Sequence, residues 1–309
     1  MNIYSCIDSK NVEKIFILFK SLVMNSKNID FNFFLLINDS SIKFNTPKFL
    51  KDKILIKKFN INNEWRETLD KFNELFYSNI PWCNNDMNFA RFFIFEHFPN
   101  INRAIYLDWD MIVLSDINNL KMYYDDYDNI VVSELEVEQS ILNATFHNNI
   151  KYKTTYQSLY QPTQKGKLEQ HGITKVLNHL NLTYDDISKN KSFNAGFFII
   201  SKNHLENNSL HDFIKLLIHA QSCTKCFNFG TQTILNLIHI NKKKFVEKEW
   251  NYIPNITDNQ IDANKLNIIH WNGSSKPWNN KLDINKVWWY YHDKFKEEIS
   301  NDKNNKNNI

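Results

Sequence analysis

Short apolar runs and helical stripes alternate along the first third of the chain. Continuous apolar runs predict buried strands over residues 2–7, 31–37, 54–59 and 103–107. Apolar residues at helical spacing predict helices over residues 11–25, 64–77 and 85–98, and Pro99 ends the last of these. Strands that alternate with helices in this way predict an α/β fold with a mostly parallel sheet and helices on both faces.

The second half of the chain is less regular. A strand is predicted at residues 130–133, and a long polar segment, 134–191, follows without clear periodicity. Long excursions of this kind often form lids or acceptor sites. Further apolar patterns predict strands over 193–201 and 267–269 and helices over 203–220 and 231–240. We therefore expect one catalytic domain over residues 1–297, followed by a polar, frayed tail over 298–309.

Composition and charge exclude several classes of protein. The net charge is +3, so the chain lacks the broad basic field of a nucleic-acid-binding protein. No apolar run approaches the ~20 residues of a transmembrane helix, and no secretory signal precedes Asp8, so a cytoplasmic location is the default. Cys223 and Cys226 form a C-x-x-C without a second metal-ligand pair, which favours reduced thiols. Only five glycines occur, where average usage of roughly 7% would give about 22, so each glycine calls for a structural reason.

Asp108 and Asp110 follow the fourth predicted strand, separated by Trp109. Two carboxylates on one turn can bind Mg²⁺ or Mn²⁺ and leave coordination positions for phosphate oxygens. Two mechanisms fit this pair. In a sugar-nucleotide transferase the metal stabilises a leaving diphosphate, whereas in a haloacid-dehalogenase-like phosphatase Asp108 would attack phosphorus.

A second polar segment follows the last predicted strand. His270 could complete a metal site with the two aspartates, and a mixed carboxylate and imidazole set favours Mn²⁺ over Mg²⁺. Gly273 would let backbone amides approach an anion, and Lys276 would place a positive charge on phosphate.

Three motifs together resemble glycosyltransferase family 8, the family of glycogenin and of bacterial lipopolysaccharide galactosyl- and glucosyltransferases. They are Asp108-Trp109-Asp110, Asn194-Ala195-Gly196, and the H-x-x-G-x-x-K-P-W sequence from His270 to Trp278. The resemblance implies a single-domain nucleotide-diphospho-sugar transferase fold, Mn²⁺, a UDP-sugar donor and retention of the anomeric configuration.

The resemblance also implies a role for individual residues. Asp108, Asp110 and His270 would bind the metal, and Gly273 and Lys276 would contact the diphosphate. The remaining donor contacts would come from Cys6, Asp8, Arg91, Asn194, Ala195 and Gly196, with Gln232 beside the anomeric carbon. The expected catalytic residues are Gln232, Asp110 and Lys276.

Some positions depart from the family pattern. Thr231 and Thr233 stand where members usually carry acids on either side of the glutamine, which affects the choice of donor sugar. Trp109 is bulkier than the usual residue and could either stack near the uridine or pack in the core. Glu134 is a weaker candidate for an acid near the acceptor.

The sequence therefore predicts a retaining, Mn²⁺-dependent hexosyltransferase that moves glucose or galactose from UDP to a hydroxyl acceptor on a glycan, protein or lipid-linked carrier. The phosphatase and a nucleotide-binding protein without turnover remain as alternatives. Tyr152, Tyr156 and Tyr160 leave self-glycosylation open, and a homodimer also stays open.

Overall fold

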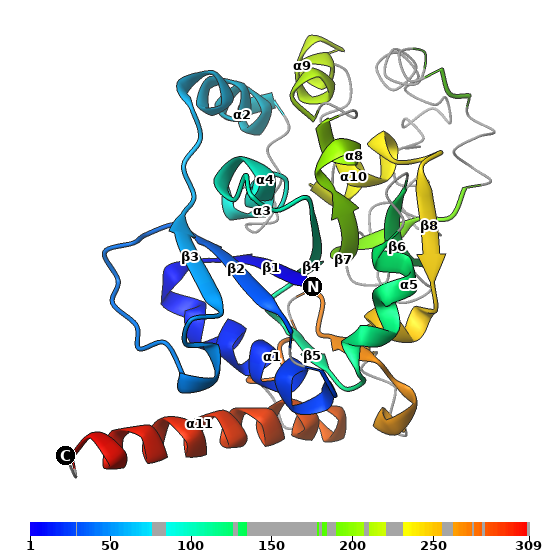
Figure 1. The fold of residues 1–309 in the computed structure, drawn as a ribbon. Coiled ribbons are helices and arrows are strands. Elements are labelled where there is room, and N and C mark those ends of the chain that lie inside the picture. The colour runs from blue at the N-terminus through cyan, green and yellow to red at the C-terminus, as the bar shows by residue number, and fades with distance from the viewer. Residues whose placement is uncertain are drawn as a thin grey trace.

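The computed structural model describes residues 1–28, 30–75, 85–125, 129–134, 178, 181–183, 190–206, 210–220, 231–254, 262–273, 275–279 and 282–307. A central sheet of seven strands dominates these residues (Figure 1). In spatial order the strands are β3 (Ile54–Lys58), β2 (Asn32–Ile37), β1 (Asn2–Ile7), β4 (Arg103–Leu107), β7 (Phe193–Ser201), β6 (Ile130–Glu134) and β8 (Lys243–Val246).

The sheet is mixed but mostly parallel, as predicted. Strands β3, β2, β1 and β4 are parallel, β7 is antiparallel to both of its neighbours, and β6 and β8 are parallel to each other. Two short strands, β5 (Met111–Val113) and β9 (Ile268–His270), form a separate antiparallel pair. The two strands come from segments that are far apart in the chain, and their pairing matters for the site described below.

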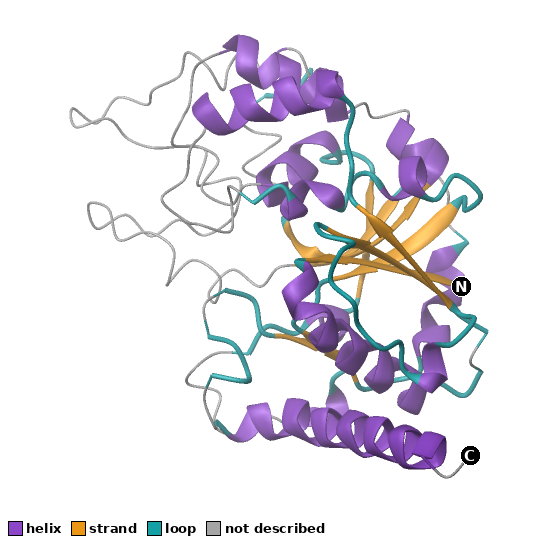
Figure 2. Ribbon diagram, turned by 90° about the vertical axis from the view of Figure 1, so that its left-hand side faces the viewer, coloured by secondary structure: helices purple, strands orange, loops and turns teal. Residues whose placement is uncertain are grey.

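Side chains alternate between two apolar cores, one on each face of the sheet. On β1, Ile3 and Ile7 face one core, whereas Tyr4 and Cys6 face the other. Helices α1 (Val12–Asn25) and α11 (Lys286–Asn307) cover the Ile3 face, with α11 as the outer layer (Figure 2).

The opposite face of the sheet is covered by a second group of helices (Figure 1). These are α2 (Asn63–Leu75), α3 (Met87–Ala90), α4 (Ile94–His97), α8 (Lys202–Glu206), α9 (Leu210–Ala220) and α10 (Thr231–Ile238). The short helix α5 (Lys121–Tyr124) packs on the α1 side. Short 3₁₀ turns occupy Ser9–Asn11, Lys48–Leu50, Ile117–Leu120, Lys248–Asn251, Ala263–Lys265 and Asp283–Asn285.

The predicted helix over residues 85–98 is wrong as a single element, because it is two short helices, α3 and α4. At the break between α3 and α4, two side chains donate hydrogen bonds to backbone carbonyls. Arg91 Nε donates to the carbonyl of Asn88 at 2.9 Å, and the Tyr4 hydroxyl donates to the carbonyl of Ala90. In a continuous α-helix these carbonyls would accept the N–H groups four residues later, whereas here the carbonyl of Ala90 accepts the N–H of Phe93, three residues later, at 3.1 Å. The predicted helix over 203–220 corresponds to α8 and α9, with 207–209 outside the described residues.

Residues 298–307, for which a frayed tail was expected, lie in α11, which continues to Asn307. Contacts with α1 explain why the polar end stays helical. Phe295 packs against Phe16 with ring centroids 6.3 Å apart, and Lys20 Nζ pairs with Glu298 at 2.5 Å. An apolar anchor and charge pairs therefore extend the helix past its apolar part.

Several expectations lie outside the described residues. These concern most of the 134–191 segment with its three tyrosines, the C-x-x-C at Cys223 and Cys226, and Gly166, Gly172 and Gly230. None of the described helices combines the length and the apolar character of a membrane span.

A buried histidine pair links α8 to the end of α10. The rings of His204 and His239 stack with centroids 4.8 Å apart, and His204 Nε2 lies 2.9 Å from His239 Nδ1. Burial, and then the neighbouring His204, lower the pKa of His239 well below its ordinary value.

This pair predicts acid destabilisation. Because the folded state resists protonation of His239, the unfolded state binds the extra proton as pH falls below about 6.5. The free energy of unfolding should then fall by up to about 1.4 kcal/mol per pH unit. The free energy of unfolding can be measured by urea unfolding at pH values from 5 to 8. Below pH 6.5, it should fall less steeply with decreasing pH in His239→Asn than in the wild type. Equal slopes in both proteins would contradict the assignment.

Candidate active site

Two carboxylates and one imidazole converge where β4 leaves the sheet. Asp108 follows β4 directly, and Asp110 immediately precedes β5. The antiparallel pairing of β5 with β9 places His270 opposite Met111. His270 Nε2 consequently lies 3.3 Å from Asp110 Oδ1 and 3.8 Å from Asp108 Oδ2.

The atoms that face one another in this cluster are buried and unsatisfied. Asp110 is 5% exposed and His270 is 1% exposed. Asp110 Oδ1 and His270 Nε2 have no hydrogen-bond partner, although a buried polar atom without one is costly. One ligand atom from each of the three residues lies within 4.8 Å of the others. Carboxylate oxygens and an imidazole nitrogen arranged in this way fit a divalent cation.

Lys276 compensates the buried charge of Asp110 from the other side. Its ammonium contacts Asp110 Oδ2 and also donates to the carbonyl of Trp271 at 2.9 Å. Burial alone would raise the pKa of Asp110, but Lys276 and the side chain of His270 lower it below the ordinary value of an aspartate. Asp110 therefore remains an anion and a usable ligand across the physiological range.

Gly196 allows the side chains of Asp108 and His270 to approach one another. A Cβ atom at this position would lie 2.3 Å from His270 Cε1 and 2.9 Å from Asp108 Oδ2. The register of β6 against β7 shifts between Val132 and Glu134, and Asn194-Ala195-Gly196 lies in that irregular segment of β7. Such a bulge re-aims side chains near a site.

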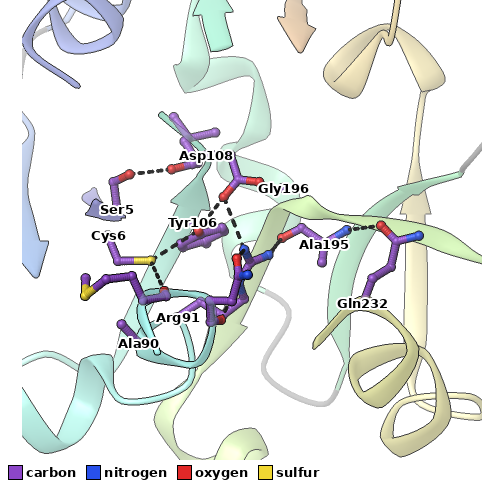
Figure 3. A network of polar contacts seen from close by, with 12 residues as sticks. Ser5, Cys6, Ala90, Arg91, Tyr106, Asp108, Ala195, Gly196 and Gln232 are labelled. Carbon is purple, nitrogen blue, oxygen red and sulfur yellow. Dashed lines mark hydrogen bonds and ion pairs between the residues drawn. The ribbon is translucent and has the colours of Figure 1, made fainter. Parts of the chain in front are cut away.

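Arg91 joins the cluster of Asp108, Asp110 and His270 to the segment at Asn194-Ala195-Gly196 (Figure 3). Its Nη1 donates to the carbonyl of Ala195 at 2.7 Å, and its Nη2 lies 3.5 Å from Asp108 Oδ1. The Tyr106 hydroxyl donates to the same carboxylate oxygen at 2.5 Å and lies 3.3 Å from Cys6 Sγ. Arg91 is thus a buried cation that orients Asp108 and is not a surface residue.

Gln232 closes the other end of this network. Its Oε1 accepts from Asn194 Nδ2 at 3.0 Å and from the backbone N–H of Ala195 at 3.3 Å. Thr231, at the start of α10, is buried beside it.

Trp109 is part of an aromatic stack beside the cluster of Asp108, Asp110 and His270. Its ring stacks on Trp278 with centroids 5.1 Å apart, and Lys276 Nζ is 5.5 Å from its centroid. Lys14, from α1, places its Nζ 4.3 Å from the Trp278 centroid and 5.0 Å from that of Trp109. The stack therefore holds the C-terminal loop against the turn that carries the aspartates.

Four other predicted residues, all within the described part of the chain, form no hydrogen bond or ion pair with the side chains of this cluster. Asp8 follows β1 at the same edge of the sheet, and its carboxylate accepts from Asn85 Nδ2 at 3.4 Å. Cys6 is buried in β1, and Gly273 has a φ of +87° that suits glycine. Glu134 pairs with Lys191 at 2.7 Å in an exposed position, and no contact among the described residues links it to the aspartates.

The sequence reasoning missed Asn251, which follows β8. Asn251 Oδ1 lies 2.9 Å from His270 Nδ1, and the side chain is buried. A polar residue between Trp250 and Tyr252 carries no periodic signal, and β8 itself was not predicted. Lys14 and Tyr106 were missed because each lies in an element, the helix over 11–25 or the strand over 103–107, that was predicted from its apolar residues.

The sequence matches a family described as Glycosyl transferase family 8 over residues 2–281. A curated relative, probable galacturonosyltransferase-like 4 of Arabidopsis thaliana, is 23% identical over 199 residues. That alignment covers 62% of this chain and 49% of the relative, so the chain spans about half the length of the curated relative that it matches.

Solved structures support the fold. An active-site mutant of LgtC has a TM-score of 0.62 at 14% identity and covers 95% of this chain and 96% of its own. GlyE of Streptococcus pneumoniae has a TM-score of 0.52 at 17% identity, covering 94% of this chain and 60% of GlyE. At these identities the likeness shows the glycosyltransferase A-type fold.

The contact at Gly196 predicts a specific loss in Gly196→Ala. The new methyl group must displace His270 or Asp108, which should destabilise the protein by about 1–3 kcal/mol and weaken Mn²⁺ binding. Urea unfolding and the Mn²⁺-dependent rise in Tm measure the two effects. Gly273→Ala is the matched control, because a Cβ there meets no atom within 4 Å and only its positive φ costs stability. A Gly196→Ala protein with the full Mn²⁺-dependent rise in Tm would contradict this account.

Proposed function

Because this chain belongs to glycosyl transferase family 8, we propose that it is a retaining glycosyltransferase that moves glucose or galactose from a UDP-sugar to a hydroxyl acceptor. The observation that carries the proposal is the buried, unpartnered pair of Asp110 Oδ1 and His270 Nε2, 3.3 Å apart beside Asp108. A cation bound between these two buried atoms would give each of them the partner that it lacks.

Asp108, Asp110 and His270 would hold the cation. The imidazole in the set favours Mn²⁺, and the two carboxylates leave Mg²⁺ as a weaker occupant. A divalent cation in this position supplies Lewis-acid stabilisation of the leaving diphosphate. Arg91 and Tyr106 orient Asp108, so this ligand is fixed before any cation binds.

Lys276 and Gly273 would bind the diphosphate. The ammonium already lies beside the cluster, and the positive φ of Gly273 turns the loop without a side chain in the way. A fixed ammonium that faces the developing negative charge lowers the barrier because no reorganisation is needed. Asp8 would read the uracil at the edge of the sheet, with backbone contacts from Cys6, and Trp109 would shield the nucleotide.

The sugar would lie against Asn194, Ala195 and Gly196, with Gln232 beside the anomeric carbon. Both N–H donors on Gln232 Oε1 come from this segment, so the amide is held as a fixed wall of the site. Burial raises the pKa of the Cys6 thiol to about 12, which makes it a poor nucleophile. We therefore favour front-face attack, in which the acceptor hydroxyl loses its proton to the departing phosphate.

The proposal also specifies the donor sugar and the type of acceptor. One LgtC structure contains donor and acceptor sugar analogues, and the Arabidopsis relative is named as a probable galacturonosyltransferase. Thr231 replaces the acid that the family usually places before the glutamine, so a carboxylate that would repel a uronic acid is missing. Glucose and galactose remain the proposed donors, galacturonic acid is the comparison, and the acceptor would be a hydroxyl of a glycan, a protein or a lipid-linked carrier.

The family match disfavours the phosphatase alternative. The cluster has one imidazole and one lysine beside the two acids, whereas a phosphatase of that class would use Asp108 as a nucleophile. Both Asp108 oxygens lie near other groups here, since Oδ1 is contacted by Arg91 and Tyr106 and Oδ2 faces His270. A family member that binds nucleotide without turnover remains as an outcome of the assay below.

Asp110→Ala should abolish Mn²⁺-dependent turnover. Removing this ligand should lower the rate of UDP-hexose hydrolysis more than about 100-fold, because loss of an outer partner alone costs about 10–100-fold. Release of UDP from UDP-glucose, UDP-galactose and UDP-galacturonic acid, with and without Mn²⁺, measures the effect. Asp293→Ala, in an exposed position on α11, is the control and should keep the wild-type rate. Equal rates in Asp110→Ala and the wild type would refute the site, and UDP binding without release in the wild type would favour the non-catalytic alternative.

Lys276→Met should shift two affinities in opposite directions. Without the ammonium, Asp110 keeps an uncompensated charge, so Mn²⁺ should bind more tightly while UDP binds more weakly. Calorimetry with Mn²⁺ alone, and with UDP at saturating Mn²⁺, measures both. Lys276→Arg keeps the charge and should change each affinity less than the methionine variant does. Weaker Mn²⁺ binding in Lys276→Met would argue against competition between the ammonium and the cation.

A further inference from the structure

A chain of buried amide groups runs from β7 to the imidazole of His270. It comprises the side chains of Gln232, Asn194 and Asn251, all of which are at least nine-tenths buried. Each hydrogen bond between amides requires one N–H donor and one carbonyl acceptor. The direction of every bond in the chain is therefore fixed once one amide is oriented.

Two backbone N–H groups provide that orientation. The N–H of Gly196 donates to Asn194 Oδ1 at 2.8 Å, so this atom must be the carbonyl oxygen. The N–H of Ala195 donates to Gln232 Oε1 in the same way. The amide nitrogen of Asn194 must then face Gln232, as the bond of 3.0 Å between Asn194 Nδ2 and Gln232 Oε1 shows.

The orientation passes next to Asn251. Because Asn194 presents its oxygen, Asn251 turns its Nδ2 toward that oxygen, at 3.4 Å. Asn251 Oδ1 is therefore the atom that faces His270 Nδ1, at 2.9 Å. A carbonyl oxygen can only accept, so Nδ1 of His270 must carry the hydrogen.

We infer that Asn251 is a positioning residue that fixes the tautomer of neutral His270, with the hydrogen on Nδ1 and the lone pair on Nε2 toward Asp108 and Asp110. The backbone supports this role, because the N–H of His270 donates to the carbonyl of Tyr252 at 2.8 Å and the N–H of Tyr252 donates to the carbonyl of Ile268 at 3.0 Å. Asn251 and His270 are thus held on neighbouring segments.

In the proposed function His270 is a metal ligand, and Asn251 is the residue that holds its second ring nitrogen; this role of Asn251 rests on that function. Residues that bond the second nitrogen of a metal-binding histidine fix its ring and raise its basicity. The amide chain adds a link to the segment proposed to line the donor sugar, since the same Asn194 bonds both Gln232 and Asn251.

Nitrogen NMR tests the tautomer directly, without donor or turnover. In metal-free protein labelled with ¹⁵N-histidine at pH 8, two-bond proton–nitrogen correlations report which ring nitrogen of His270 carries the hydrogen, and His270→Gln identifies its signals. We expect the hydrogen on Nδ1 in the wild type. A neutral ring with its hydrogen on Nε2 and none on Nδ1 would overturn the inference, whatever the enzyme assay shows.

Three variants separate positioning from stability. Asn251→Ala should populate both tautomers and lower Mn²⁺ affinity about 10–100-fold, measured by calorimetry. Asn251→Asp keeps an acceptor for Nδ1 and should keep the tautomer and the affinity, even though its contact with Asn194 is lost. Asn236→Ala removes another buried amide that binds Phe193 of β7 and should lower Tm without changing the tautomer. An Asn251→Ala protein with unchanged tautomer and Mn²⁺ affinity would overturn the inference, and if it fails to fold, loss of the tautomer in Asn251→Asp would do so.

Discussion

The close approach of β7 to His270 is the constraint on which the site depends. The Cα of Gly196 lies where a larger residue would strike the imidazole, and its carbonyl accepts the N–H of Asp108 at 2.9 Å. This one backbone position therefore sets the spacing of the first carboxylate and the histidine together. The antiparallel pairing of β7 with β4 places the start of β7 beside the end of β4.

The acidic groups of the site are paired with basic groups, which makes their burial possible. Asp110 lies in the protein interior, where an isolated carboxylate would be costly, and the ammonium of Lys276 offsets that cost. Arg91 does the same for Asp108. Each acid thus has a basic partner from a distant segment, and the aromatic stack of Trp109 on Trp278 keeps the loop that carries Lys276 in place.

The sequence predicted most of the frame but only part of the site. Strands β1, β2, β4 and β7 were readable as mostly apolar runs, and Asp108, Asp110 and His270 were singled out by their places after predicted strands. The buried strand predicted over 54–59 exists as β3, but Lys57 and Lys58 end its apolar run and the strand is not buried. Strands β5 and β8, of three and four residues, were not predicted, whereas the equally short β9 was predicted from the apolar pair before His270. The break between α3 and α4 depends on Tyr4, more than eighty residues away, and Asn251 acts through a contact that exists only after β8 and β9 meet. Long-range contacts of this kind leave no trace in a local pattern.

The charges of the cluster favour joint binding of the proposed cation and the proposed diphosphate. Asp108 and Asp110 are balanced by Arg91 and Lys276, so the site is close to neutral as it stands. A divalent cation alone would leave excess positive charge in a buried place, and a diphosphate alone would leave excess negative charge. In the proposed function each ligand would neutralise the other, and Lys276 could exchange Asp110 for phosphate without leaving an acid unpaired. The unsatisfied atoms of Asp110 and His270, which cost about 1–3 kcal/mol each when buried, would gain a partner at the same moment. The charge of this cluster would therefore couple the binding of the two proposed ligands.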